Sequence, residues 1–177
     1  MIPQNNKMLG DYLYDDVYVD SIHSRLTGEE KRIRLFIINY IIDKGVGFDL
    51  GLLTEDTCRL LSVDYSKINE TIKSMSGKEG FFVEDNIVKF IYPVSSVKTP
   101  HRVTLEDGRE YSAMCAIDSL GSTFTFKSNT KINSKCACCG ESISVEVEDG
   151  QVKNPSHSKI YVLHANMKKF KNYGNSC

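Results

Sequence analysis

The segment from Gly28 to Lys44 constrains the fold most, because the spacing of its apolar residues predicts one long helix with an apolar face. The residues of this predicted face are Leu35, Ile37, Ile38, Tyr40, Ile41 and Ile42. Gly45 and Gly47 follow directly and predict its C-terminal end. The first part of the chain is therefore built around a helix that needs other elements to cover it.

Two further helices and a strand pair are predicted after this helix. Thr54 opens one helix and Asp64 caps the next. Strands over residues 80–83 and 87–91 turn at Glu84, Asp85 and Asn86. Three helices and a hairpin predict a winged-helix-like unit over residues 29–95, preceded by a polar N-terminal arm over residues 1–28.

A winged-helix-like unit raises the possibility of DNA binding, and the charge pattern argues against it. The presumed recognition helix carries only two lysines, Lys67 and Lys73, and the whole chain has a net charge of −1. Specific DNA binding usually involves several phosphate contacts. We therefore expect the unit to be a scaffold and not a nucleic-acid reader.

The second part, over residues 96–177, is predicted to be a small antiparallel core. A hairpin is expected around Asp107 and Gly108, a short helix over residues 111–121 with Gly121 as its stop, and strands near 123–127, 142–147 and 159–164. Together the two parts predict the α+β fold class.

The predicted short helix carries Cys115 and Asp118. Positions three apart share a helix face, so a thiol and a carboxyl are expected side by side. This pairing would join a soft nucleophile to a proton carrier. The alternative is a buried cysteine that acts as a small hydrophobe, with a surface aspartate nearby.

Six cysteines in an otherwise ordinary composition suggest thiol chemistry or metal binding. No apolar run approaches the roughly 20 residues that a membrane span needs, and the N-terminus lacks the pattern of a signal peptide. These features predict a cytoplasmic protein without membrane association, where disulfides are rare. Cys58, on an apolar helix face, is predicted to be a core residue.

Three cysteines crowd into one turn, Cys136, Cys138 and Cys139. The turn contains a Cys-x-x-Cys spacing, which is half of a structural zinc site. A full zinc site would need His157, His164 or Cys177 as well. A packed thiol turn, an accessory soft-metal site and a zinc site all remain open.

Several consecutive motifs resemble the alkylmercury (organomercurial) lyase family. They are Thr-Pro-His-Arg at 99–102, Glu-Asp-Gly-Arg at 106–109, Cys-Ala-Ile-Asp-Ser-Leu at 115–120, Ser-Lys-Cys at 134–136 and Ser-Ile-Ser-Val at 142–145. The resemblance covers roughly residues 31–177 and is strongest over 99–145. In that family a winged-helix-like unit precedes the catalytic core and covers its active site.

The resemblance implies a catalytic site of Cys115, Asp118 and a second cysteine, for which Cys177 is the candidate. Thiolates bind the soft metal and the carboxyl relays a proton to carbon, which releases the hydrocarbon and leaves Hg(II) on the cysteines. No organic cofactor is implied. The substrate would be an organomercurial, and cellular thiols or a mercuric reductase would accept the Hg(II).

The chain departs from the family pattern in two places. It stops at Cys177, where a typical member continues through its second catalytic cysteine, and a terminal residue is usually mobile. Cys136 matches a cysteine that the family uses structurally, whereas Cys138 and Cys139 lie outside the pattern and are candidates for accessory mercury capture. An alternative function is therefore a winged-helix metal-sensing or metal-sequestering protein that binds soft metal without bond cleavage.

Overall fold

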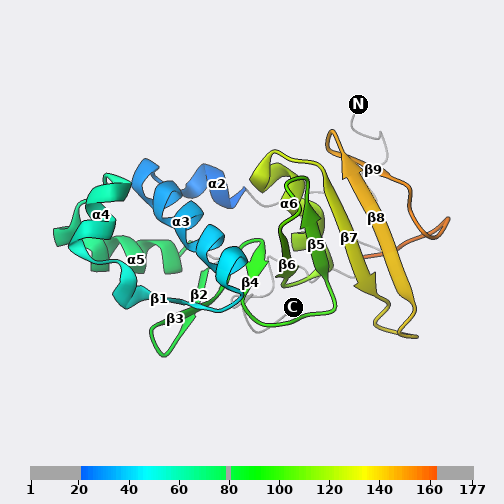
Figure 1. The fold of residues 1–177 in the computed structure, drawn as a ribbon, viewed down its shortest axis with the longest axis horizontal. Coiled ribbons are helices and arrows are strands. Elements are labelled where there is room, and N and C mark those ends of the chain that lie inside the picture. The colour runs from blue at the N-terminus through cyan, green and yellow to red at the C-terminus, as the bar shows by residue number, and fades with distance from the viewer. Residues whose placement is uncertain (1–20, 79–80, 163–177) are drawn as a thin grey trace.

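The computed structural model describes residues 21–78 and 81–162. It combines helices with one antiparallel sheet, which confirms the predicted α+β class. The helices are α2 (Ile22–Arg25), α3 (Gly28–Lys44), α4 (Glu55–Leu61), α5 (Ile68–Ser76) and α6 (Ala116–Phe126), with 3-10 turns η1 (Leu50–Leu52) and η2 (Tyr65–Lys67). The strands are β1 (Phe48–Asp49), β2 (Phe81–Glu84), β3 (Ile87–Ile91), β4 (Val94–Ser95), β5 (Arg102–Leu105), β6 (Glu110–Ala113), β7 (Thr130–Lys135), β8 (Ser142–Glu148) and β9 (Gln151–Lys153). Helices α2 to α5 gather at one end of the molecule, and α6 lies beside strands β5 to β7 (Figure 1).

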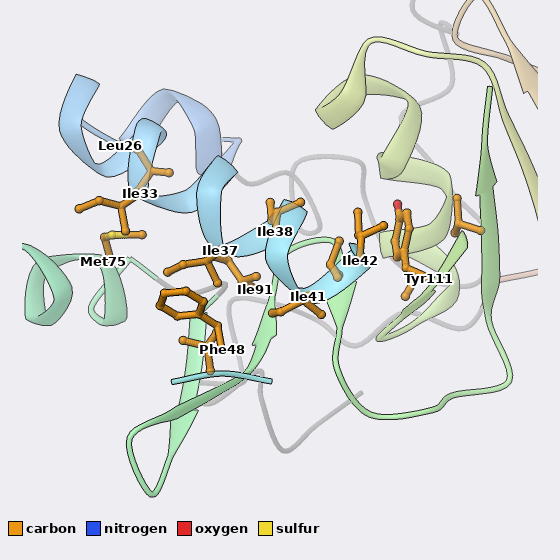
Figure 2. Close-up of a cluster of buried hydrophobic side chains, with 14 of the residues drawn as sticks. Leu26, Ile33, Ile37, Ile38, Ile41, Ile42, Phe48, Met75, Ile91 and Tyr111 are labelled. Carbon is orange, nitrogen blue, oxygen red and sulfur yellow. The ribbon is translucent and has the colours of Figure 1, made fainter. Parts of the chain in front are cut away.

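Helix α3 is the centre of the apolar core. A reciprocal capping box between Thr27 and Glu30 starts the helix, and Gly45, at φ 68°, ends it in the left-handed conformation. Along the helix, Ile33 lies beside Met75, Ile37 lies beside Phe48 and Ile91, and Ile42 lies toward Tyr111 (Figure 2). The buried isoleucines of the helix are Ile33, Ile37, Ile38, Ile41 and Ile42.

One residue of the predicted apolar face was wrongly assigned. Leu35 is 44% exposed, whereas Ile33, which the prediction omitted, is fully buried. A residue two positions from Ile33 or Ile37 points about 200° away from it around a helix, so Leu35 faces away from the core.

The shorter helices and the hairpin of the first half are present as predicted. The Thr54 side chain accepts a hydrogen bond from the backbone N–H of Thr57 at the start of α4, and Asp64 caps η2, which leads into α5. Strands β2 and β3 then pair as an antiparallel hairpin. The interpretation of these elements as a winged-helix-like unit stays a prediction, and residues 1–20 of the predicted arm lie outside the described part.

A single sheet runs through the described part of the chain, in the order β1-β3-β4-β6-β5-β7-β8-β9, with β2 also paired to β3. The two-residue strand β4 hydrogen-bonds to β3 on one side and to β6 on the other. The predicted boundary between residues 95 and 96 therefore falls at a strand that joins the two parts. The domain bounds themselves stay a prediction.

Two turns shape the second half, and the one at Asp107 and Gly108 forms as predicted. Gly108, at φ 85°, closes the β5–β6 hairpin, and Asp107 accepts hydrogen bonds from the backbone and side chain of Arg109. Strand β8 covers the predicted 142–147 segment, and Asp149 and Gly150 turn into β9 with positive φ angles.

The helix predicted over residues 111–121 is wrong at both ends. Residues 110–113 form strand β6, and α6 begins only after Cys115 and continues through Gly121 to Phe126. The strand predicted near 123–127 is therefore largely the last turn of this helix. Of the strand predicted near 159–164, residues 159–162 have no regular structure, and the remainder lies outside the described residues.

Gly121 does not stop the helix because it has a different role. A side chain at this position would overlap the hydroxyl group of Tyr92, which packs directly against the helix backbone. Gly121 is therefore a close-approach glycine inside α6, and the left-handed residue at the helix end is Lys127, at φ 51°.

None of the helices in the described ranges has the length and apolar character needed to cross a membrane.

Candidate active site

Cys115 lies at the junction between strand β6 and helix α6, where it is the N-cap residue. Its backbone is extended, with φ −142° and ψ 178°, and its carbonyl oxygen accepts hydrogen bonds from the backbone N–H of Ser119 (3.0 Å) and from Ser119 Oγ (2.8 Å). The expectation that Cys115 sits on a helix face is thus wrong. The residue precedes the helix, at the end where partial positive charge from the backbone favours negative charge.

Asp118 is the third residue of α6 and folds back toward the cap. Its carboxylate accepts hydrogen bonds from the backbone N–H and from the thiol of Cys115. This is one half of the reciprocal pattern known at helix starts, in which a side chain at the third position bonds to the cap backbone. The predicted closeness of thiol and carboxyl is therefore present, through capping geometry instead of a shared helix face.

The environment of Asp118 suits proton transfer. The residue is only 8% exposed. Burial raises the pKa of its carboxyl from 3.8 to about 6, although the hydrogen bonds from Cys115 act in the opposite direction. A carboxyl that titrates near neutral pH can both accept and release a proton under ordinary conditions.

Tyr92 lines this site, and sequence reasoning missed it. Burial raises the pKa of its hydroxyl to about 12, and the nearby charges of Asp118 and Cys115 act in the same direction. No spacing rule connects residue 92 to residue 118. The only signal in the sequence is Gly121, a glycine inside a helical segment, which can mark close packing of another residue.

Arg34 connects the long helix to this tyrosine. It is 5% exposed, its guanidinium donates a 2.6 Å hydrogen bond to the Tyr92 carbonyl oxygen, and its charge lies 5.9 Å from the centre of the tyrosine ring. The cation–ring contact adds to this link between α3 and the site.

The buried residues of α6 are polar. They are Asp118, Ser119, Ser122 and Thr123. Ser122 Oγ donates to the Asp118 carbonyl oxygen at 2.9 Å and accepts a hydrogen bond from the Tyr111 hydroxyl group. These bonds satisfy the buried hydroxyls and fix the helix against β6.

The approach segment before β5 ties three strands together. Thr99 Oγ1 donates to the Ala113 carbonyl oxygen, and the backbone N–H of Ala113 donates to the His101 carbonyl oxygen at 2.9 Å. His101 Nδ1 lies 2.9 Å from Ser134 Oγ, and burial lowers the pKa of this histidine. The family-like motifs at 99–102 and 134–136 thus meet at the sheet end that also carries Cys115.

The cysteine-rich turn connects β7 to β8. The sulfur of Cys136 accepts hydrogen bonds from the backbone N–H groups of Cys139 and Cys138 and from the Cys139 thiol, which lower the pKa of Cys136. Cys138 and Cys139 are exposed. The turn is held by hydrogen bonds from Cys136 N to Glu141 O (2.8 Å) and from Gly140 N to Cys136 O (2.9 Å).

The remaining predicted residues include one core cysteine and two residues that lie beyond the described part of the chain. Cys58 is fully buried in the core, as predicted, and burial raises its thiol pKa. Cys177 and His164 lie outside the described residues. Within residues 21–78 and 81–162, no group of three or more His, Cys, Asp or Glu residues could hold a metal ion.

Comparisons with known proteins point to the family that the sequence motifs resemble. The family model for alkylmercury lyase (MerB) matches residues 94–177. A solved structure, the mercury-bound form of MerB2, is similar with a TM-score of 0.57 and 20% sequence identity, over 76% of this chain and 63% of that one. This chain thus spans less than two thirds of that protein, and at this identity the likeness concerns the fold. No curated protein matches the chain. Residues 94–177, just under half of the chain, hold Cys115, Asp118 and the cysteine-rich turn, and this part is similar to the alkylmercury lyase family.

Proposed function

We propose that this protein is an organomercurial lyase that cleaves the carbon–mercury bond by protonolysis. The observation that carries the proposal is the buried Asp118 carboxyl, hydrogen-bonded to the Cys115 thiol at the start of α6. The family match over residues 94–177 supports the choice of substrate class, since thiolates select soft metals.

In the first step, Cys115 captures the substrate R–Hg⁺. The thiol proton passes to the Asp118 carboxylate, a sulfur–mercury bond forms, and the ligand that previously held the mercury leaves. The hydrogen bond from the Cys115 thiol to Asp118 gives this proton a direct path.

In the second step, a second thiol approaches the mercury, with Cys177 as the candidate, and it binds as a thiolate once Asp118 is free to take its proton. Asp118 delivers a proton to the carbon, whose bonding electron pair to mercury becomes the new C–H bond. The hydrocarbon R–H leaves, Hg²⁺ stays on the two sulfurs, and Asp118 takes up the second thiol proton. No oxidation state changes, so no organic cofactor is needed.

The first half of the chain acts in this proposal as a winged-helix-like scaffold that covers the catalytic helix. Arg34 from α3 fixes Tyr92, and Tyr92 packs on α6 over Gly121. We therefore assign this half to shaping the site and not to DNA. The proposed setting is the cytoplasm, with cellular thiols or a mercuric reductase taking the Hg(II).

To test the proposal, the purified protein is incubated with methylmercury and excess thiol, and the methane released is measured by gas chromatography. We expect Cys115→Ser to lose at least a thousandfold in rate, because serine offers a hard oxygen ligand with no proton to give near neutral pH. Cys177→Ser should lose activity to a similar extent. Cys138→Ser, an exposed cysteine outside the site, is the matched control and should keep the parental rate.

Methane production by Cys115→Ser at the parental rate would rule out the assigned nucleophile. Tight binding of methylmercury by the parental protein without methane would favour the alternative, a metal-sensing or metal-sequestering protein. Unchanged cleavage by Cys177→Ser would show that Cys177 is not the second thiolate, and the roles assigned to Cys115 and Asp118 would stand.

A further inference from the structure

The turn between β7 and β8 places two thiols in contact outside the Cys115 site. The Cys139 thiol donates a hydrogen bond to the Cys136 sulfur, and the backbone N–H groups of Cys138 and Cys139 point at the same sulfur. Successive backbone N–H groups aimed at one atom form a concave site for negative charge, a geometry that recurs at metal–sulfur centres. The turn therefore brings two sulfur atoms together, with backbone N–H groups beside one of them.

The shape of the turn is held by its own backbone. Gly140 adopts φ 74°, and its N–H donates to the Cys136 carbonyl oxygen, while the Cys136 N–H donates to Glu141. The turn thus needs no bridging ion to keep Cys136 and Cys139 together. It presents Cys139 on the exposed side, where an incoming ion can reach it.

The surroundings favour an ion that takes two ligands over one that takes four. His157 is the described histidine nearest in sequence to the turn, and both of its ring nitrogens have partners. Its Nδ1 lies 2.7 Å from Ser156 Oγ, and its Nε2 lies 3.2 Å from Glu141 Oε1. Zinc prefers four ligands, whereas Hg²⁺ is satisfied by two thiolates in a near-linear arrangement.

We propose that Cys136 and Cys139 form a second soft-metal site, which binds Hg²⁺ through two thiolates. On binding, two sulfur–mercury bonds form, two thiol protons pass to solvent, and nothing is oxidised or reduced. Cys138 contributes its backbone N–H to the turn, and its side chain is not a ligand.

The sheet places this second site at the same end as Cys115. Strand β6 runs toward Cys115 and β7 runs toward Cys136, and both flank the start of β5, where Arg102 pairs with Ser112 on one side and with Asn133 on the other. Strands lie about 4.8 Å apart, so β6 and β7 are roughly 10 Å apart across β5. The second site could thus receive the Hg²⁺ that cleavage leaves behind, a role that rests on the proposed function.

The test is titration with Hg²⁺ alone in the Cys115→Ser protein, with free cysteine as competitor and sulfur-to-mercury absorption in the ultraviolet as the signal. Free cysteine removes mercury held by a single thiol, so the retained metal reports a thiolate pair. We expect one retained equivalent. Adding Cys139→Ser or Cys136→Ser should remove it, with at least a hundredfold loss of affinity, whereas adding Cys138→Ser should keep it.

Retention of the equivalent in both the Cys139→Ser and Cys136→Ser proteins, or its loss in the Cys138→Ser protein alone, would overturn this assignment. Circular dichroism checks that each variant is folded. Because these proteins all lack Cys115, the result does not depend on cleavage, and methane release by the parental protein tests the proposed function separately.

Discussion

The two ends of the sheet are buried in different ways. Against β3 and β4, helix α3 packs a row of isoleucines that are almost completely removed from solvent. Beside β5 to β7, helix α6 buries a carboxyl and three hydroxyl groups instead. Apolar burial stabilises a fold at about 25 cal/mol per Å², whereas a buried carboxyl opposes folding wherever it must be ionised. The comparison indicates that α3 supplies most of the apolar burial, whereas α6 carries the buried polar groups to which we assign the proposed chemistry.

The link between the two ends is narrow and specific. The Arg34 side chain extends from α3 and donates a hydrogen bond to the Tyr92 carbonyl oxygen. The Tyr92 hydroxyl group in turn packs against Gly121 in the middle of α6. The stable helix is thus connected to the polar one through a single aromatic residue and a glycine that makes room for it.

The largest expected effect tests the apolar end. Ile37→Ala should lower the free energy of unfolding by about 4 kcal/mol, because it opens a cavity at a fully buried position. Leu35→Ala, on the exposed side of the same helix, should cost less than about 1 kcal/mol. Denaturant unfolding of both variants measures the difference, and equal losses would mean that α3 does not supply the core in the manner described.

The second prediction tests the polar end through pH. Burial raises the pKa of Asp118 above its unfolded value, so its proton stabilises the folded state below pH 3.8, and this stability is lost as pH rises through about 6. The difference amounts to about 3 kcal/mol. Asparagine does not ionise, so the free energy of unfolding of Asp118→Asn should exceed that of the parental protein by an amount that grows between pH 4 and pH 7. The same variant should lose turnover.

The control for this measurement is Asp107→Asn. A hydrogen bond from the Arg109 backbone lowers the pKa of Asp107, with the Arg109 side chain acting in the same direction. Its contribution has the opposite sign, because it is present at neutral pH and disappears as pH falls. Unfolding curves of the Asp118→Asn protein that follow the parental protein at every pH would show that Asp118 titrates normally.

The smallest effect tests the link between the ends. Gly121→Ala should cost about 2 kcal/mol, because overlap with the Tyr92 hydroxyl outweighs the helix propensity that alanine adds. In a Tyr92→Phe background the same change should cost distinctly less, since the closest overlapping atom is gone. Gly77→Ala, which meets only ordinary contacts, is the control and should be close to neutral. Additive costs for Gly121→Ala and Tyr92→Phe would contradict the direct contact.

Local signals in the sequence predicted the helical part of the fold well. The end of α3 was predicted from Gly45, and the capping box of Thr27 and Glu30 that starts the helix is an equally local signal, although it was not used in the prediction. The predicted helix around Cys115 failed because its residues support either a strand or a helix, and pairing with β4 and β5 decides between them.

The candidate site was predictable in part. Cys115 and Asp118 are three residues apart, so their proximity needed only a helical turn near them. Tyr92 and Arg34 reach the site from distant parts of the chain through the packing of α3 on the sheet, which no short-range pattern encodes. The contact between Cys136 and Cys139 was readable from spacing, but the two N–H groups aimed at one sulfur depend on the turn conformation.

The short strand β4 has a practical consequence for anyone who expresses part of this protein. The family match begins at Val94, which is the first residue of β4, and this start invites a truncated clone of residues 94–177. Such a fragment would lose β3 and leave the backbone N–H and C=O groups of β4 open along one edge. Open edges recruit strands from other copies, so the fragment should aggregate. Cloning the chain with β3 and α3 included keeps that edge covered.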